Sequence, residues 1–311
     1  MVIIRMSGGL GNQMFQYALY MKLKSQGKEV KFDDILEYRR DNARPIMLSV
    51  FGIEYPRATW DEIISFIDGS PKISQRIKRK LFGRKSLIIH EKDVNYDPNL
   101  LEHDPAYLAG YFQSEKYFKD IEADIRKIYT FPERSEVQLP LDLEQRISTY
   151  QYLIEQTNAI GVHIRRGDYL VSYETHGGIC TDAYYETALA YMQARFPDAV
   201  FYVFSDEIKW AKKWLEARFI KPGGNELDER FCLIEGSTEH TGYLDMMLLT
   251  KCKHYIIANS SFSWWGAYLC NNQDKVIIAP EKWLNNAESL DIFTDNMIKV
   301  SVEGKLLPYD E

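Results

Sequence analysis

The 311-residue sequence has few cysteines, no long apolar run and no excess of basic residues. Its four cysteines form no Cys-x-x-Cys pair, which argues against a zinc site and against a disulfide framework. No apolar stretch approaches the length of a membrane-spanning helix, and the first residues lack the apolar core of a signal peptide. The formal net charge of −7 argues against a general DNA- or RNA-binding protein. These absences predict a cytoplasmic protein with free thiols.

The remaining composition is that of a folded protein with two domains. Apolar residues make up 45% of the chain and charged residues 27%, as in globular and not in disordered proteins. A length of 311 residues suits two domains better than one core. The 21 Tyr, 15 Phe and 6 Trp provide ring surface for cores and for stacking on sugars or bases.

The second half alternates short apolar runs with helical patterns. The apolar runs predict strands over residues 159–164, 199–204, 231–234, 254–258 and 275–279. The helical patterns lie between them, over residues 183–196, 207–217, 241–252 and 262–270. This alternation predicts βαβ units and a parallel sheet that is covered on both faces.

The first half is less regular but begins in the same way. Strands are expected over residues 2–6, 29–32 and 107–111, and helices over residues 12–25 and 115–128. A polar, proline-containing stretch over residues 131–143 is typical of a linker. We therefore predict an α/β protein of two Rossmann-like lobes, residues 1–150 and 151–311, that face a central cleft. About the last 20 residues either belong to the second lobe or pack back on the first.

Two arginines follow the first predicted strand of the second lobe. Ligands of open α/β sheets bind outside the carboxyl ends of the strands. Arg165 and Arg166 lie at such an end, with His163 before them and Asp168 after them. Guanidinium groups bind phosphate oxygens bidentately and stay charged, so this pair suits a diphosphate. The alternative is an ion-pair network between the arginines and nearby acids.

Two further strand ends carry polar side chains. Ser205 and Asp206 follow the second predicted strand, where Asp206 either binds a base or ribose or caps the next helix. The helix expected over residues 262–270 begins with Phe262 and is preceded by a polar run: Asn259, Ser260 and Ser261. Hydroxyls and free N–H groups at a helix start suit an anion. Helix capping is the alternative, but it requires only one such residue.

The first lobe carries a glycine-rich loop between a strand and a helix. The loop contains Gly8, Gly9, Gly11, Asn12 and Gln13. It lacks the third glycine of a dinucleotide fingerprint and the Lys-Ser/Thr of a P-loop. Its glycines allow close approach to a ligand, and Asn12 and Gln13 can donate or accept hydrogen bonds at the cleft. The adjacent acids Asp33 and Asp34 could suggest a metal site, but no further ligands accompany them. The sequence therefore predicts no metal site.

Three segments occur in an order that resembles a known family. They are MSGGLGNQMFQ at residues 6–16, HIRRGDY at 163–169 and NSSFSWWGA at 259–267. Together with FSD at 204–206, they make the chain similar to bacterial α-1,2-fucosyltransferases of glycosyltransferase family 11. The resemblance extends from residue 1 to about residue 285.

The resemblance implies a GT-B type fold, GDP-β-L-fucose as donor and a galactose-terminated glycan as acceptor. It implies transfer to the galactose 2-hydroxyl with inversion, giving an α-1,2 fucoside, without a cofactor or an obligatory divalent metal. The arginines would then stabilise the charge of the leaving group, as a metal does elsewhere. Two alternatives remain: a transferase for another GDP-sugar or another fucosyl linkage, and a non-catalytic glycan- or nucleotide-binding protein.

The resemblance also assigns roles to matching residues. Arg165 matches the arginine that holds the β-phosphate, and Arg166 is a second candidate for phosphate. His163 is expected to point toward the nucleotide, and Asp206 matches the acidic position that reads guanine, with Glu207 as its substitute. Asn12 matches an asparagine near the transferred sugar. The segment around the diphosphate and ribose is matched by Ser260, Ser261 and Phe262.

A base could accept the proton of the attacking 2-hydroxyl, but the sequence does not single one out. Asp168 is close to the arginines, although pairing with them would lower its pKa and make it a poor base. Glu174 and His176, on the loop after Asp168, are further candidates. A strongly dissociative reaction needs little help from a base.

A basic stretch in the first lobe lies outside these motifs. Seven Lys and Arg residues lie between Gly69 and His90, and no acid does. Ile73, Ile77 and Leu81 recur every four residues beside them, which predicts an amphipathic helix over residues 72–85. Such a helix suits an anionic surface at the inner face of a membrane or a polyanionic acceptor, with a solvated helix as the alternative.

Overall fold

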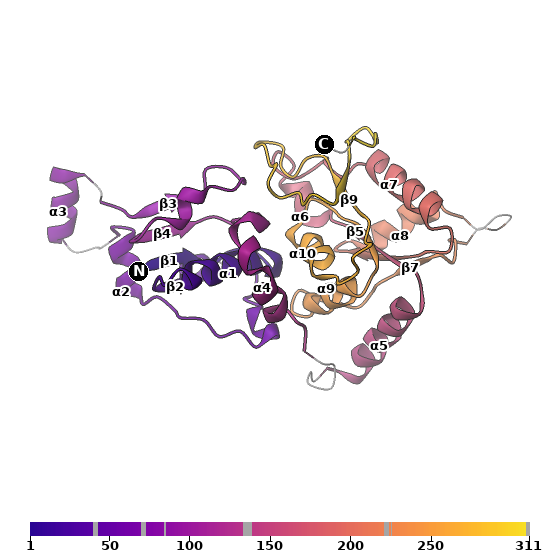
Figure 1. Cartoon of the computed structure of the whole chain (residues 1–311), viewed down its shortest axis with the longest axis horizontal. Helices are drawn as coiled ribbons and strands as arrows, with labels where there is room; N and C mark the ends of the chain where they lie inside the picture. Colours follow the sequence, from indigo (N-terminus) through magenta and orange to yellow (C-terminus); the bar gives the residue numbers. More distant parts are fainter. Residues whose placement is uncertain are drawn as a thin grey trace. The chain divides into compact units, whose positions relative to one another are not determined.

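The computed structural model describes residues 1–39, 43–69, 73–83, 85–132, 139–220, 224 and 226–308, except for the side chains of residues 75, 76, 78, 79 and 82. The chain forms two compact units (Figure 1). Unit 1 comprises Met1–Thr130 and Leu290–Ile292, and unit 2 comprises Phe131–Ser289 and Phe293–Glu311. The expected boundary between residues 150 and 151 falls inside helix α5 (Leu141–Gln156) of unit 2. Within the expected linker, residues 133–138 lie outside the described residues.

Unit 1 contains a four-stranded parallel sheet in the order β2-β1-β4-β3 (Figure 1). Its strands are β1 (Val2–Arg5), β2 (Val30–Asp33), β3 (Ile88–His90) and β4 (Ala106–Ala109). Its helices, in the described part of the chain, are α1 (Leu10–Ser25), α2 (Trp60–Phe66), α3 (Ile73–Phe82) and α4 (Glu122–Ile128). The helix expected over residues 115–128 is shorter than predicted, because two 3₁₀ turns, Glu115–Tyr117 and Lys119–Ile121, precede α4.

A buried carboxylate joins the strands of this sheet. Asp33, at the end of β2, has no exposed surface. Its Oδ1 accepts the N–H groups of Ile35 and Leu36, and its Oδ2 accepts the hydroxyl of Tyr107 on β4 at 2.6 Å. Because a buried charge requires such partners, Asp33 is a structural residue of the sheet.

Unit 2 contains a six-stranded parallel sheet in the order β10-β9-β8-β5-β6-β7. Its strands are β5 (Ala159–Ile164), β6 (Val200–Ser205), β7 (Phe231–Leu233), β8 (His254–Ile256), β9 (Ile277–Pro280) and β10 (Met297–Val300). In its described part, α5 is joined by α6 (Gly167–Val171), α7 (Asp182–Arg195), α8 (Ile208–Glu216), α9 (Gly242–Thr250) and α10 (Ser261–Leu269). Read from β7, this is the 3-2-1-4-5-6 strand order of dinucleotide-binding domains.

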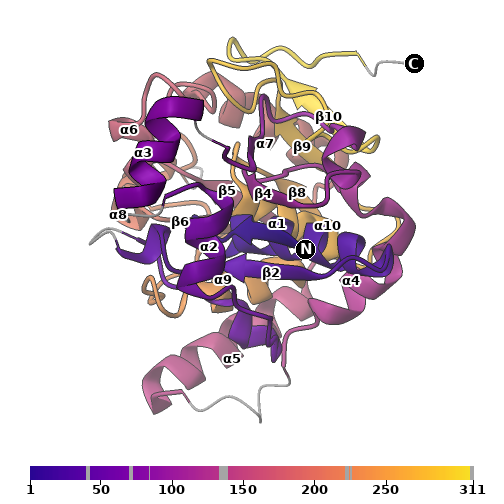
Figure 2. The same ribbon diagram turned by 90° about the vertical axis from the view of Figure 1, so that its left-hand side faces the viewer.

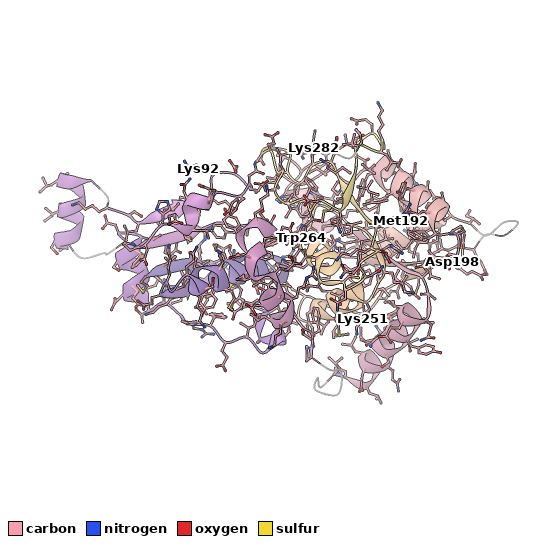
Figure 3. The ribbon with its side chains drawn as sticks, in the orientation of Figure 1. Lys92, Met192, Asp198, Lys251, Trp264 and Lys282 are labelled. Carbon is pink, nitrogen blue, oxygen red and sulfur yellow. The ribbon has the colours of Figure 1, made fainter. Side chains whose placement is uncertain are left out.

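Strand β5 lies at the centre of unit 2 and is buried on both faces. Successive side chains of a strand point to opposite faces of the sheet. Ile160, Val162 and Ile164 pack in the core with residues of α7 and α8. Gly161 faces α9 instead, where Leu249 lies against its Cα. The interior on this side also contains Trp264 of α10, which has no exposed surface (Figure 3).

The predicted α/β class with two parallel sheets is confirmed, and the five strands expected in the second half are present. Strands β3 and β10 were not predicted, because each is only three or four residues long and only partly apolar. The amphipathic helix expected over residues 72–85 is present as α3, with Lys72 and Arg84 outside the described residues. None of the helices in the described part of the chain combines the length and hydropathy needed to span a membrane.

The contact between β5 and α9 yields a test of the packing. A Cβ at Gly161 would collide with the Cδ1 atom of Leu249, which is itself fully buried. Gly161→Ala should therefore lower the free energy of unfolding by about 1–3 kcal/mol, as other overpacked cores do. Gly242→Ala is the matched control, because no atom lies within 4 Å of a Cβ there. Urea denaturation measures both, and equal stability of the two variants would contradict the packing described.

Candidate functional site

The strand order of unit 2 reverses direction between β5 and β8. The chain adds β6 and β7 on one side of β5, and β8, β9 and β10 on the other. At such a reversal the loops that leave the two central strands turn away from each other and open a crevice. The loop after β5 carries Arg165 and Arg166, and the loop after β8 carries Asn259 and Ser260. The sheet therefore brings two of the predicted motifs to one edge.

Arg165 lies between two carboxylates. Its side chain is 16% exposed, with Nη2 2.8 Å from Asp168 and Nη1 3.3 Å from Asp206. Burial by itself would lower the pKa of Arg165, but Asp206 and Asp168 raise it overall, so the guanidinium stays charged. The ring of Tyr169 lies 5.6 Å from the guanidinium carbon. These partners hold the cation in a defined orientation.

Asp206 holds the loop after β5 through the backbone. Its carboxylate accepts the N–H of Arg166 at 2.9 Å and the N–H of Gly167 at 3.0 Å. A Cβ at position 167 would lie 2.8 Å from the same carboxylate, so the contact requires glycine. Ser205 accepts the N–H of Glu207 at 3.0 Å and thereby shapes the turn that presents Asp206. Asp206 is thus an anchor of the loop, and its role in reading guanine stays a prediction.

Arg166 makes a different set of contacts. Its guanidinium lies over the ring of Trp210 at 4.2 Å and its Nε is 3.3 Å from the carboxylate of Glu207. Arg165 and Arg166 together therefore contact three carboxylates, so the ion-pair network considered as the alternative is present. A bound phosphate would compete with Asp168 for Arg165, and Asp168 is the most exposed of the three acids.

The two arginines line a cavity of about 230 Å³ within unit 2. Its wall includes Trp210, Tyr169, His176 and Asn259. Rings and cations in one cavity suit a ligand that carries both a planar group and an anion.

His163 is buried next to this loop, on the face of β5 that α10 covers. Its ring packs against Phe262 at a centroid distance of 5.2 Å. Burial, together with the charge of Arg165, lowers the pKa of His163 to about 3. Its Nδ1 has no hydrogen-bond partner within the described part of the chain. A neutral, buried and unsatisfied nitrogen is a group that a bound ligand can satisfy.

The loop after β8 leads directly into α10. Ser260 is the N-cap residue, but its side chain makes no capping hydrogen bond, and Ser261 is the first helical residue. Asn259 is buried and donates its amide to the carbonyls of His176 and Trp283, each at 3.1 Å. Asn259 therefore fastens the loop to its neighbours, and an anion-binding role of the helix start beside it stays a prediction.

The base candidates lie on and after α6. Asp168 is paired with Arg165, and a carboxylate in such an ion pair is a weak proton acceptor. Glu174 is exposed in the turn that follows α6. His176 stacks on Tyr169 at 4.9 Å, and burial lowers its pKa. None of these contacts selects one residue as the base, and the assignments stay predictions.

Unit 1 has its own reversal of strand order, between β1 and β4. Gly8 follows β1 with a φ of +76°, and a side chain there would collide with Asn12. Asn12 accepts the Nε2 amide of Gln113, which follows β4, at 2.8 Å. Gln16 bonds both the N–H of Ser7 and the carbonyl of Gly110. The glycine loop is thus tied to the end of β4, which fixes the orientation of the Asn12 amide.

Three predicted members of this loop take different places. Gly9 is the N-cap of α1, and Gly11 lies buried in its first turn. Gln13, which was expected to donate or accept hydrogen bonds at the cleft, is fully buried. Its amide instead bonds the carbonyls of Gly8 and Pro45 and the N–H of Met47. Gln13 therefore connects the loop to the segment that follows β2.

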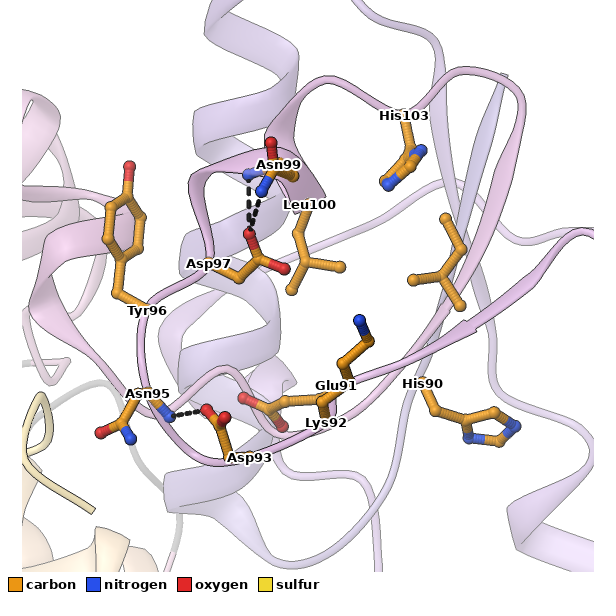
Figure 4. Close-up of a pocket in the computed structure, with 11 residues that line it drawn as sticks. His90, Glu91, Lys92, Asp93, Asn95, Tyr96, Asp97, Asn99, Leu100 and His103 are labelled. Atoms are coloured by element: carbon orange, nitrogen blue, oxygen red, sulfur yellow. Dashed lines mark hydrogen bonds between the residues drawn. The ribbon is translucent and has the colours of Figure 1, made fainter. Parts of the chain in front are cut away.

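Unit 1 also contains a cavity of about 430 Å³ that the sequence did not indicate (Figure 4). Its wall runs from β3 through the next turn and includes His90, Glu91, Asp93, Asp97 and His103. No motif marks this segment, because its polar residues are spaced irregularly and gather only when the loop closes on β3.

Glu91 is the most perturbed acid of this cavity. It accepts the N–H groups of Tyr111 at 2.7 Å and Phe112 at 3.0 Å, and Phe112 has a positive φ of 55°. Burial, opposed by these two bonds, raises the pKa of Glu91 to about 7. Glu91 thereby braces the turn that carries Gln113, the partner of Asn12.

Both units are α/β with a parallel sheet, which is the class of fold predicted from the sequence. A family model described as "Glycosyl transferase family 11" matches residues 91–299. The chain is 33% identical over 302 residues to an alpha-1,2-colitosyltransferase of Escherichia coli, covering 92% of this chain and 93% of the relative. The chain therefore belongs to glycosyltransferase family 11.

Two other proteins are similar to this chain. The human galactoside alpha-(1,2)-fucosyltransferase 1 is 31% identical over 295 residues, covering 92% of this chain and 70% of the human protein. Among solved structures, a mutant of Arabidopsis thaliana FUT1 in complex with GDP matches with a TM-score of 0.48 and 11% identity, covering 91% of this chain and 71% of that chain.

The contacts of Asp206 separate an anchoring role from a ligand-reading role. Asp206→Ala leaves two N–H groups without their acceptor and removes one of the two carboxylates beside Arg165, so the free energy of unfolding should fall by about 2 kcal/mol. Glu207→Ala is the control, since Glu207 makes one exposed ion pair and its loss should change stability by less than about 1 kcal/mol. Chemical denaturation measures both. Unchanged stability of Asp206→Ala, together with lost nucleotide binding, would contradict the anchoring role.

Proposed function

We propose that this glycosyltransferase moves L-fucose from GDP-β-L-fucose to the 2-hydroxyl of a terminal galactose, with inversion and without an obligatory divalent metal. The proposed catalytic residues are Arg165, Asn12, Asp168 and Glu174. The proposed donor-binding residues lie in unit 2, and the acceptor is proposed to bind unit 1. The following paragraphs give the support for each part.

One observation carries the proposal: Arg165 and the start of α10 occupy the two sides of the β5/β8 reversal. An arginine and a helix N-terminus are the two protein features best suited to a diphosphate. In this proposal Arg165 binds the β-phosphate and Ser260 and Ser261 surround the diphosphate. Phe262 and His163 then contact the nucleotide, where neutral His163 contributes a hydrogen bond and no charge.

Charge stabilisation of departing GDP is the main catalytic contribution expected from these residues. Charge builds up on the β-phosphate as the bond to C1 of fucose breaks, and a fixed cation stabilises it without reorganisation. Arg165 is already held in place by Asp206 and Asp168, so its orientation costs little on binding. A cation of this kind supplies what a bound metal would otherwise supply.

Asn12, in the glycine-rich loop, is proposed to contact the transferred sugar. Its amide is oriented by Gln113, and the Gln113 loop is braced by Glu91. The cavity beside Glu91 is lined by carboxylates, amides and the ring of Tyr96 (Figure 4). Such groups suit the hydroxyls and apolar faces of a glycan, which supports unit 1 as the acceptor side.

A donor that carries a sugar other than fucose is a specific alternative. The E. coli relative is named for the transfer of colitose and the human relative for the transfer of fucose, and both names specify an α-1,2 linkage. The linkage is therefore better supported than the donor sugar. A colitosyl donor bound by the same residues of unit 2 is the alternative to GDP-fucose.

The assay combines GDP-β-L-fucose with lactose, lacto-N-biose or N-acetyllactosamine in buffer containing EDTA. We expect GDP release, and NMR of the product should identify a fucosyl-α-1,2-galactose linkage. Arg165→Ala should lower kcat/KM at least about 100-fold, because a charge-stabilising donor of the transition state is lost. Arg230→Ala is the matched control, since Arg230 pairs with Asp228 before β7, and it should keep near wild-type activity.

Three results would contradict parts of the proposal. Transfer from a colitosyl donor alone would replace fucose by the alternative sugar. Near wild-type activity of Arg165→Ala would contradict the phosphate assignment. Activity that disappears in EDTA and returns with a divalent metal would contradict a metal-independent reaction.

A further inference from the structure

Helix α3 exposes a stripe of large aliphatic side chains. Ile73, Ile77 and Leu81 are 75%, 54% and 69% exposed. Residues four positions apart lie on one face of a helix, so the three side chains form a continuous apolar strip. In both views α3 lies at the edge of unit 1, away from strands β1 and β2 (Figures 1 and 2). Packing within unit 1 does not explain these three side chains.

The same segment concentrates positive charge. Seven Lys and Arg residues lie between Gly69 and His90 without an acid, in a chain whose net charge is −7. Lys80, within α3, is exposed. The rest of the chain therefore carries a large negative charge. An anionic surface would attract this basic segment and repel the remainder.

Helix α5 also exposes large apolar side chains, but it does not combine them with a basic segment. Helix α5 exposes Leu141 at 68% and Tyr152 at 64%. Acids accompany them on the same helix, among them Asp142 and Glu144. An anionic surface would repel α5, so α3 is distinguished by the combination of an apolar strip with cations.

We propose that α3 is an interfacial membrane helix that binds an anionic lipid surface. Its apolar strip enters the boundary between headgroups and acyl chains, and the surrounding cations contact the lipid phosphates. A soluble polyanion would pair with the cations but leave the strip in water, so the strip favours lipid over such a partner. The proposal is independent of the sugar donor, because α3 contains none of the residues assigned to the donor or to catalysis.

Vesicle co-sedimentation of the full chain tests this directly. Vesicles of phosphatidylcholine with phosphatidylglycerol should bind the protein, vesicles of phosphatidylcholine alone should bind it far less, and salt should weaken the binding. The variant Ile73→Ser/Ile77→Ser/Leu81→Ser keeps every charge but loses the strip. Its affinity for the anionic vesicles should fall at least about tenfold, because several buried methylene groups are lost per side chain.

The matched control is Leu141→Ser/Tyr152→Ser on α5, which should bind the anionic vesicles as the wild type does. Thermal unfolding followed by circular dichroism, and transfer to a soluble acceptor, should be unchanged in both variants, since all five side chains are exposed. Absence of wild-type binding, or equal binding by the α3 variant, would overturn the proposal. Heparin binding that matches vesicle binding and does not depend on the strip would also overturn it, by identifying a polyanion site.

Discussion

The carboxylate of Asp206 makes the contacts on which the proposed donor site depends. It accepts the N–H groups of Arg166 and Gly167 and lies beside the guanidinium of Arg165. One side chain at the end of β6 thus fixes both the path of the loop after β5 and the orientation of its cation. The absence of a side chain at Gly167 is part of the same contact, because a Cβ there would press on the carboxylate. The loop after β5 can present Arg165 only while this arrangement holds.

The parallel sheets determine which loops can meet. In both units the strand order reverses at the centre, between β1 and β4 in unit 1 and between β5 and β8 in unit 2. In unit 2 this brings Arg165 near the start of α10, and in unit 1 it brings Asn12 to Gln113. Groups far apart in the sequence are therefore gathered by topology, and hydrogen bonds then fix their orientation.

Much of this could be predicted from local sequence. The alternation of strands and helices gave the parallel sheet of unit 2, and the position of Arg165 after a strand indicated where a phosphate could bind. What could not be predicted depends on partners distant in sequence. Gln13 and Asn259 resemble ligand-binding amides in their motifs, yet their amides bond the chain itself. The cavity beside Glu91 is lined by irregularly spaced polar residues of β3 and the loop after it, and no periodic pattern records such a gathering.

The central claim is that Arg165 binds the β-phosphate of the donor nucleotide, and calorimetric titration of GDP and GMP tests it most directly. GDP and GMP differ by that phosphate, and a charge-assisted hydrogen bond contributes about 1.5–3 kcal/mol, or at least about tenfold in affinity. The wild type should therefore bind GDP at least about tenfold more tightly than GMP, and Arg165→Ala should bind the two nucleotides almost equally. A preference for GDP that survives unchanged in Arg165→Ala would contradict the account.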